Sequence, residues 1–180
     1  TNSLGAEAAN HDVKKAVLLE AVVMQMTWPG APTVYYGDEA GMVGWTDPDN
    51  RRSYPWGKQD WELIEFHKDM IRIHKKYECF RSGSYKSIAS GSHWICYGRF
   101  NKKLQAVILI NNRRETLTVD LPIWQICILE NACLKRVIQT TQSTYNVGEV
   151  MERAEDGILH VTVGPQTASV YIAAKNVEEN

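Results

Sequence analysis

The sequence predicts an α+β composite in two parts, a β/α fragment over residues 1–80 followed by an antiparallel β-sandwich over residues 81–180. The spacing of apolar residues is helical before residue 80 and has a period of two after it. Short β-branched runs separated by turn formers then recur along the second half, which is typical of a sandwich.

The first helix is expected over residues 13–27, because this run is apolar on nearly all of its sides. A helix of that kind is buried by neighbours on several faces. Asn10 or Asp12 is expected to cap its N-terminus, since a short side-chain oxygen accepts a hydrogen bond from an otherwise free backbone N–H. The sequence P-G-A-P at residues 29–32 ends the helix, because proline lacks that N–H.

Thr33–Tyr36 is expected to form a short buried strand, since it is β-branched and aromatic and lies between turn formers. The loop over residues 37–58 is long for a segment without regular structure, and such loops usually carry function. A second helix is expected from Gln59 or Asp60 to Tyr77, where apolar residues recur three and four apart. One strand alone has no sheet to join, so residues 1–80 would complete a structure begun elsewhere.

The second half is expected to hold eight strands. They cover residues 85–89, 94–100, 105–111, 116–121, 125–129, 134–139, 158–163 and 168–173. Apolar and polar residues alternate most clearly in residues 117–121 and 159–163, the pattern of a strand with one buried face.

The composition argues against two classes of partner. The chain has a formal net charge of −1, with 44% hydrophobic and 23% charged residues, an ordinary balance for a folded protein. We expect no nucleic-acid partner, since no basic run interleaved with aromatic residues occurs. We expect no membrane partner, since no apolar run reaches the roughly 18 residues of a span. The N-terminal residues lack the pattern of a signal peptide.

Cys79, Cys96, Cys127 and Cys133 form no CxxC pair and have no histidine at zinc-ligand spacing. Cys96 and Cys127 lie in apolar strand-like runs, where a free cysteine behaves as a small hydrophobic residue. We therefore expect free, mostly buried thiols and a cytoplasmic location, because disulfides are rare in reducing compartments. Secretion is the alternative location, and Cys127–Cys133 is the one short-range bridge to consider.

Residues 28–56 carry the most specific pattern of the chain. They read W-P-G-A-P-T-V-Y-Y-G-D-E-A-G-M-V-G-W-T-D-P-D-N-R-R-S-Y-P-W. This stretch resembles the α-amylase family, glycoside hydrolase family 13, and its D-P-D-N-R form is most like the neopullulanase, cyclomaltodextrinase and maltogenic amylase branch. The resemblance covers nearly the whole chain but is specific only here.

The resemblance implies an architecture for both parts. Thr33–Tyr36 would be the eighth strand of a TIM barrel, residues 59–77 its last helix, and residues from Ser84 onward the C-terminal antiparallel sandwich. Residues 131–156 depart from the short sandwich usual in the family, and the sequence assigns them no role. The chain would be the C-terminal part of a retaining α-glucan hydrolase acting on α-1,4 or α-1,6 glucosidic bonds.

The resemblance also implies that the catalytic carboxylates lie elsewhere. Family members use an Asp nucleophile after the fourth strand, a Glu acid/base after the fifth and an Asp after the seventh, and no motif for the first two occurs here. Asn10-His11-Asp12 matches the N-H-D of the third. However, no strand precedes it and a helix follows at once, so a helix cap is the preferred interpretation. We expect no catalytic residue and no activity from this chain alone.

Several partners follow from the same resemblance. They are an α-glucan oligosaccharide or polysaccharide, the missing N-terminal portion of the barrel and a second copy in a homo-oligomer. We expect no cofactor. Calcium occurs in the family, but no site for it is evident in these residues. A stand-alone glucan-binding module and a related transglycosylase or isomerase are the alternative functions.

Asp47 and Arg51 are the best candidates for substrate contacts. Four residues apart around a proline-containing turn, they offer a carboxylate acceptor and a forked donor to neighbouring sugar hydroxyls. The resemblance implies that they contact glucose units on the non-reducing side of the cleavage point. The structural alternative is a turn cap plus a salt bridge to Asp38, Glu39 or Asp49.

Trp45 and Tyr36 complete the predicted substrate site. A tryptophan exposed in a polar loop stacks well on a sugar ring, and a packing role explains Trp45 equally well. Tyr36 and Gly37 lie near the C-terminal end of the expected strand, where active sites of this fold lie. Asp38 and Glu39 follow, and ion pairing with the arginines at positions 51 and 52 is preferred over catalysis, because adjacent residues at a strand end diverge.

The remaining candidates are interpreted as structural. His67 and His74 are seven residues apart on one helix face, which is too far for a metal pair, so packed or solvated histidines are expected. His93, Trp94 and Trp124 would form a sugar platform on the sandwich in the binding-module hypothesis, and packing is the preferred interpretation.

Overall fold

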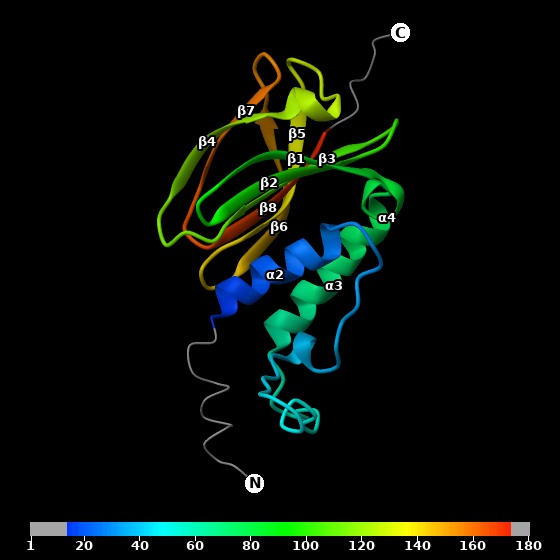
Figure 1. Ribbon diagram of the computed structural model, residues 1–180, viewed down its shortest axis with the longest axis vertical. Helices are drawn as coiled ribbons and strands as arrows, with labels where there is room; N and C mark the ends of the chain where they lie inside the picture. Colours follow the sequence, from blue (N-terminus) through cyan, green and yellow to red (C-terminus); the bar gives the residue numbers. More distant parts are fainter. Residues whose placement is uncertain (1–13, 174–180) are drawn as a thin grey trace.

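The computed structural model describes residues 14–173. Two helices pack beside a sandwich of antiparallel sheets, and the long loop between the helices extends away from the sandwich (Figure 1). The expected caps Asn10 and Asp12 and the N-H-D motif of residues 10–12 lie outside the described residues. Within the described part, every helix is too short or too polar to cross a membrane.

The two long helices are α2, Lys15–Thr27, and α3, Trp61–Lys76. Both confirm the helices expected from the apolar spacing. The carboxylate of Asp60 caps α3, because its Oδ1 accepts a hydrogen bond of 3.0 Å from the backbone N–H of Leu63. The backbone before α2 is extended at Lys14, whose side chain makes no capping hydrogen bond.

Three short helices join these elements: η1, Asp38–Ala40; α4, Cys79–Ser82; and η2, Ile123–Ile126. The strands are β1, Ser84–Gly91; β2, Trp94–Phe100; β3, Gln105–Asn111; β4, Leu117–Pro122; β5, Cys133–Thr140; β6, Tyr145–Arg153; β7, Ile158–Val163; and β8, Thr167–Ala173. Six strands form one sheet in the order β1-β2-β3-β8-β5-β6, and β4 pairs with β7 in the other. All pairings are antiparallel, as predicted.

Two predictions about the strands are wrong. Residues 125–129 form no strand, because η2 occupies their start and Cys127 has a left-handed backbone with φ 61°. β6 was not predicted, because most of its residues are exposed and their burial does not alternate. It is an edge strand within the unassigned stretch 131–156.

The expected strand Thr33–Tyr36 is also wrong for this chain, since the structure places these residues in irregular backbone. Val34, Tyr35 and Tyr36 are 37%, 49% and 44% exposed. The physical reason is that a strand needs a neighbour for its backbone N–H and C=O groups. Neither sheet of the described chain lends an edge to this segment.

Two hydrophobic clusters stabilise the fold. One lies between the helices and the six-stranded sheet, and includes Leu19 and Phe66 from the helices and Ile108 from β3. The other fills the space between the two sheets, with Leu109 from the larger sheet and Leu159 from the smaller. The helical part and the sandwich therefore share a core, and the domain boundary at residue 80 stays a prediction.

A buried arginine ties the sandwich to the end of α2. Arg99 of β2 is 2% exposed and donates hydrogen bonds to the carbonyls of Thr27, at 2.7 Å, and Gly83, at 3.0 Å. The hydroxyl of Tyr97 lies 2.6 Å from that of Thr27. The ring of Trp28 packs against Tyr97, with centroids 5.1 Å apart. These contacts hold the last turn of α2, where the chain enters the specific stretch 28–56.

All four cysteines are free thiols, as expected. Cys79 and Cys96 are buried, and burial raises the pKa of the Cys79 thiol to about 11. Cys127 and Cys133 are exposed, so the expectation that Cys127 lies buried in a strand is wrong.

Candidate functional site

The candidate site lies in the loop over residues 37–58, which begins with a glycine that no other residue replaces easily. Gly37 has φ 90°, in the left-handed region. A Cβ added there would lie 2.6 Å from the Cε of Met42, so a residue with a side chain would also displace Met42. The backbone N–H of Gly37 donates to Oε2 of Glu39 at 2.9 Å.

The far end of the loop is fastened at Asp60. Its N–H donates to the carbonyl of Ala40 at 3.1 Å, and its Oδ2 accepts from Nζ of Lys15 at 2.8 Å. Partial burial raises the pKa of Asp60, but the hydrogen bonds from Lys15 and the backbone of Leu63 lower it by more. Asp60 thus joins the loop to both long helices, through its backbone N–H to Ala40 and through its carboxylate to Lys15 and Leu63.

Within the loop, residues 46–51 form two overlapping turns. The N–H of Asp49 donates to the carbonyl of Thr46 at 2.9 Å, and the N–H of Arg51 donates to that of Pro48 at 3.0 Å. The turns bring Asp47 and Arg51 together, with Nη2 of Arg51 3.0 Å from Oδ1 of Asp47. Their side chains are 61% and 68% exposed, so this predicted pair faces solvent.

A second ion pair, between Arg52 and Asp49, stabilises these turns. Arg52 donates two hydrogen bonds to Asp49, from Nε at 3.2 Å and from Nη2 at 2.6 Å. This contact lowers the pKa of Asp49. The hydroxyl of Tyr36 donates to the carbonyl of Arg52 at 2.9 Å. The predicted Tyr36 is therefore placed to anchor the turn that presents Asp47 and Arg51.

The electrostatics also place Tyr36 near Arg51. Partial desolvation and the neighbouring Tyr35 raise the pKa of Tyr36, whereas the charge of Arg51 lowers it. The two tyrosine rings are in contact, with centroids 4.8 Å apart. Trp45 precedes the turns and is 53% exposed. The structure thus gathers Tyr36, Asp47 and Arg51 at one turn, with Trp45 on the same loop.

The prediction that Asp38 and Glu39 pair with the two arginines of the loop is wrong. Those arginines pair with Asp47 and Asp49 instead. Glu39 accepts the hydrogen bond from Gly37, and burial raises the pKa of Asp38. The sequence suggested Asp49 only as a possible salt-bridge partner of Arg51. The two hydrogen bonds that it accepts from Arg52 were not predicted.

The two helix histidines are packed, as expected. His67 is 3% exposed and its Nδ1 lies 2.8 Å from the carbonyl of Leu63. Nδ1 of His74 lies 2.7 Å from the carbonyl of Met26. Over residues 14–173, no three His, Cys, Asp or Glu side chains gather in a way that would hold a metal ion.

The tryptophans of the sandwich differ in exposure. Trp94 is half-buried and lies against Gly91, where a Cβ would come 2.3 Å from its indole Nε1. Packing is thus confirmed for Trp94. Trp124 in η2 is 59% exposed, so the expectation that it is packed is wrong.

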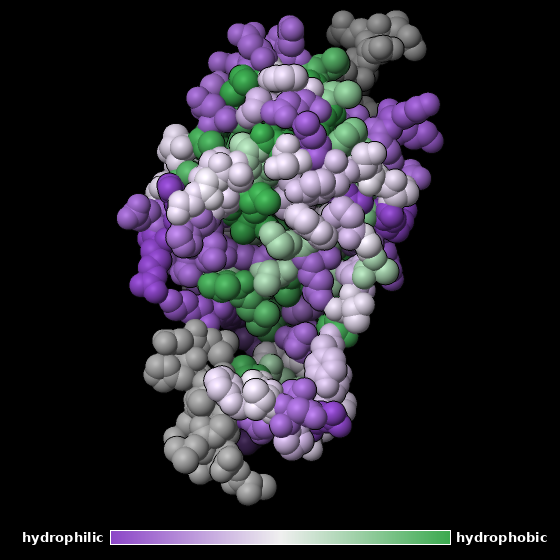
Figure 2. All heavy atoms as spheres, viewed as in Figure 1, coloured by the Kyte–Doolittle hydropathy of each residue, from purple (hydrophilic) through white to green (hydrophobic). Residues whose placement is uncertain are grey.

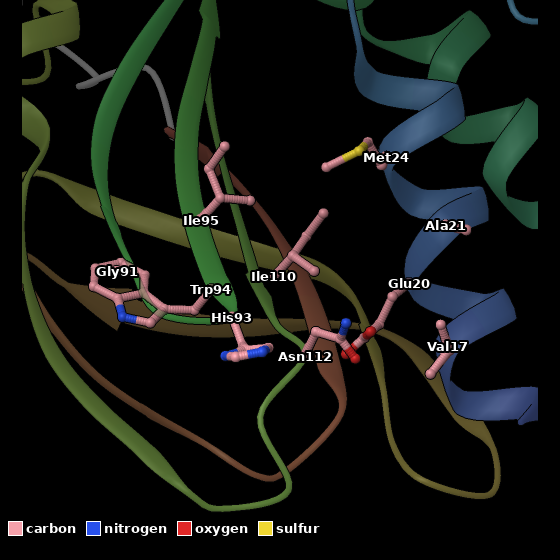
Figure 3. A pocket seen from close by; sticks show the side chains of 10 residues that line it. All are labelled: Val17, Glu20, Ala21, Met24, Gly91, His93, Trp94, Ile95, Ile110 and Asn112. Carbon is pink, nitrogen blue, oxygen red and sulfur yellow. The ribbon is translucent and has the colours of Figure 1, made fainter.

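Sequence reasoning also missed a buried carboxyl group. Glu20 of α2 is 3% exposed and lines a pocket of about 400 Å³ between α2 and the sheet (Figure 3). The only signal in the sequence is an acidic residue within the apolar run K-A-V-L-L-E-A-V-V-M.

Comparisons with known proteins find similar sequences among amylopullulanases and cyclomaltodextrinases. The chain is 39% identical over 79 residues, 44% of its length, to an amylopullulanase of Thermoanaerobacter thermohydrosulfuricus, and covers 5% of that protein. It is 34% identical over 116 residues, 62% of its length, to a cyclomaltodextrinase of Geobacillus thermopakistaniensis, and covers 19% of it. The chain therefore spans a fifth or less of these curated relatives. No family model matches the chain.

The fold agrees as well. The α-amylase of Geobacillus thermoleovorans, solved in complex with acarbose, superposes with a TM-score of 0.76 and 25% identity, covering 91% of this chain and 34% of that one. The mostly antiparallel fold with few helices matches the C-terminal domain of such amylases. The chain is therefore similar to amylopullulanases and cyclomaltodextrinases in sequence and to α-amylases in fold, and these similarities are consistent with the C-terminal portion of such enzymes.

Proposed function

We propose that this chain is the C-terminal part of a retaining α-glucan glycoside hydrolase that cleaves α-1,4 or α-1,6 glucosidic bonds. The observation that carries the proposal is the exposed pair of Asp47 and Arg51, 3.0 Å apart on a braced turn. The names of its relatives, amylopullulanase and cyclomaltodextrinase, support a glucan substrate.

The chemistry of the pair suits a substrate contact. A carboxylate accepts and a guanidinium donates, so together they bind two neighbouring sugar hydroxyls with charge-assisted hydrogen bonds. An ion pair this exposed contributes little stability. Asp47 and Arg51 therefore exchange their mutual contact for sugar hydroxyls at small cost, while Asp49 and Arg52 keep the turn in place.

The pair does not replace the catalytic groups. A retaining mechanism needs two carboxyl groups roughly 5 Å apart across the scissile bond, one as nucleophile and one as acid/base. No motif for the nucleophile or the acid/base of the family occurs in this sequence. We therefore assign both catalytic carboxylates to chain that this sequence does not contain, and we expect the purified 180-residue protein to be inactive.

We further infer that Thr33–Tyr36 and the helix over residues 59–77 correspond to the last β/α unit of a TIM barrel. The support is physical: Val34, Tyr35 and Tyr36 are exposed and have no sheet to join. Beside them, a hollow of about 480 Å³ runs from Met24 along residues 28–33. Segment and hollow are the features expected of a barrel strand and helix whose neighbours are supplied by the missing N-terminal portion.

A chimeric enzyme tests the substrate role. This chain would replace the matching C-terminal segment of the cyclomaltodextrinase of Geobacillus thermopakistaniensis, and cyclodextrin hydrolysis would be measured. We expect an active chimera in which Asp47→Ala raises KM about tenfold, the loss of a charge-assisted contact. The matched control is Asp120→Ala, which removes an exposed carboxylate paired with His160 on the sandwich. Equal effects of both substitutions, or hydrolysis by the unfused 180-residue chain, would contradict the proposal.

A stand-alone binding module is the second candidate, because Trp124 exposes 59% of its surface on the sandwich. A flat exposed indole is a stacking surface for sugar rings. Titration of maltotetraose against tryptophan fluorescence separates the two candidates. Binding by the isolated chain that is lost in Trp124→Ala and kept in Asp47→Ala would favour the module.

A further inference from the structure

The pocket between α2 and the β2–β3 pair has an apolar wall and a polar end (Figure 3). Met24 from α2 faces Ile95 and Ile110 from the sheet across the apolar part. Figure 2 shows hydrophobic residues across the middle of the same face, where Figure 1 places α2. A volume of about 400 Å³ accommodates a small organic ligand.

The polar end holds an unsatisfied carboxyl group. Glu20 is 3% exposed, and its Oε1 has no hydrogen-bond partner within the described residues. Buried polar atoms are normally paired, because an unpaired one costs the free energy of removing it from water. Burial raises the pKa of Glu20 to about 8. Asn112 and His93 line the same end of the pocket.

We propose that this pocket binds a cationic group on an apolar stem, an alkylammonium or alkylguanidinium, and that Glu20 releases its proton to solvent on binding and becomes the counter-ion. The N–H groups of such a ligand supply the donors that Oε1 of Glu20 lacks. Its stem lies along Met24, Ile95 and Ile110, and the side-chain carbonyl of Asn112 accepts a further hydrogen bond. A sugar carries hydroxyls all round its ring and leaves them unpaired against the apolar wall.

Two sources offer this chemistry, a free amine and the side chain of an arginine or lysine on another polypeptide segment. The proposal does not rest on the glucan function, since none of the pocket residues belongs to the loop over residues 37–58. An inactive chimera would leave it unchanged.

Isothermal titration calorimetry with four probes of one stem length tests the proposal on the full 180-residue chain. We expect n-pentylammonium and n-pentylguanidinium to bind with a Kd on the order of 1 mM, n-pentanol at least tenfold more weakly, and pentanoate not at all. Glu20→Gln should weaken cation binding at least tenfold. The matched control Glu65→Gln, an exposed carboxylate on α3, should leave it unchanged.

A second variant guards against an indirect effect of Glu20. Ala21→Phe fills the pocket from an exposed position of α2 and should also abolish cation binding, although Glu20 is intact. Binding of the blocked peptide acetyl-Ala-Arg-Ala-amide would assign the cation to a polypeptide, and binding of the free amines alone would assign it to a small molecule. Pentanol as tight as the cations, or unchanged cation binding in Glu20→Gln, would overturn the proposal.

Discussion

The segment Thr33–Tyr36 and strand β3 show what an apolar run needs to become a strand. Both are β-branched and apolar, and both follow a turn. The core of β3, residues 106–110, is buried between β2 and β8, which supply backbone partners on both sides. Val34, Tyr35 and Tyr36 have no such neighbours and are exposed. An apolar, β-branched pattern therefore produces a strand only where a neighbouring strand offers hydrogen-bond partners to its backbone.

Paired truncations should reproduce this contrast and give the largest effect. Ile108→Ala in β3 removes a fully buried side chain and should lower the free energy of unfolding by about 4 kcal/mol, through lost burial and a cavity. Val34→Ala should change it by less than about 0.5 kcal/mol, because more than a third of Val34 is exposed and it belongs to neither hydrophobic cluster. Urea unfolding followed by circular dichroism measures both. A loss above about 2 kcal/mol at Val34 would mean that the segment is ordered by contacts absent here.

A second substitution breaks the join between the two regions. Arg99→Met keeps most of the side-chain volume but leaves the carbonyls of Thr27 and Gly83 without their donor. We expect the free energy of unfolding to fall by about 3 kcal/mol, because both carbonyls would then lack a hydrogen-bond donor in a buried or partly buried place. Arg72→Met, which removes an exposed ion pair on α3, is the control and should cost less than about 1 kcal/mol. Equal losses would show that Arg99 does not hold the two regions together.

Glu20 lies at the same junction and should make stability depend on pH. Its folded pKa of about 8 exceeds the reference value of 4.5, so the folded state binds the proton more tightly than the unfolded state. Stability should therefore be highest below about pH 4.5 as far as this group is concerned, fall as pH rises to about 8, and level off above it. The loss is on the order of 5 kcal/mol, at about 1.4 kcal/mol for each pH unit between the two values. Chemical unfolding at pH 5 and pH 9 measures it.

Glu20→Gln should remove this slope, whereas Glu65→Gln should keep it. His93 is the other titratable residue that lines the pocket, so His93→Gln in both backgrounds separates its contribution. A pH slope of equal size in the parent chain and in Glu20→Gln would contradict the assignment.

The smallest effect should be confined to the loop. Asp49→Asn weakens the brace from Arg52 and should increase the rate of limited proteolysis within residues 46–51 several-fold. The urea midpoint of the sheet should not change, because the loop projects away from the sandwich (Figure 1). Asp156→Asn, in an exposed turn of the sandwich, serves as the control. Faster cleavage throughout the chain would mean that the loop and the sheets unfold together.

The sequence predicted most of the sheet, and its failures have physical causes. The bounds of β2, β3 and β7 were predicted to the residue, because apolar runs between turn formers are local signals. β6 was missed because an edge strand exposed along most of its length has no such alternation. The strand expected over residues 125–129 is absent because Cys127 has a left-handed backbone, which a hydrophobic run in the sequence does not reveal.

The sequence indicated Asp47 and Arg51 as substrate contacts from their spacing around a turn, and that role stays a prediction. The ion pair between them was not predicted. Their brace by Arg52 depends on which of two adjacent arginines points inward, and the sequence does not distinguish them. The Glu20 pocket combines residues from α2 and a sheet more than seventy positions away, so only the fold reveals it.

Through Arg99, the sandwich also fixes the position of the end of α2. Its hydrogen bond to the last turn of α2 sets the point from which the chain departs toward Gly37, ten residues later. A displacement of β2 relative to α2 therefore also moves the start of the loop over residues 37–58. If the loop contacts glucan as proposed, exchanging sandwiches between relatives should alter glucan preference while every residue of the loop is left unchanged.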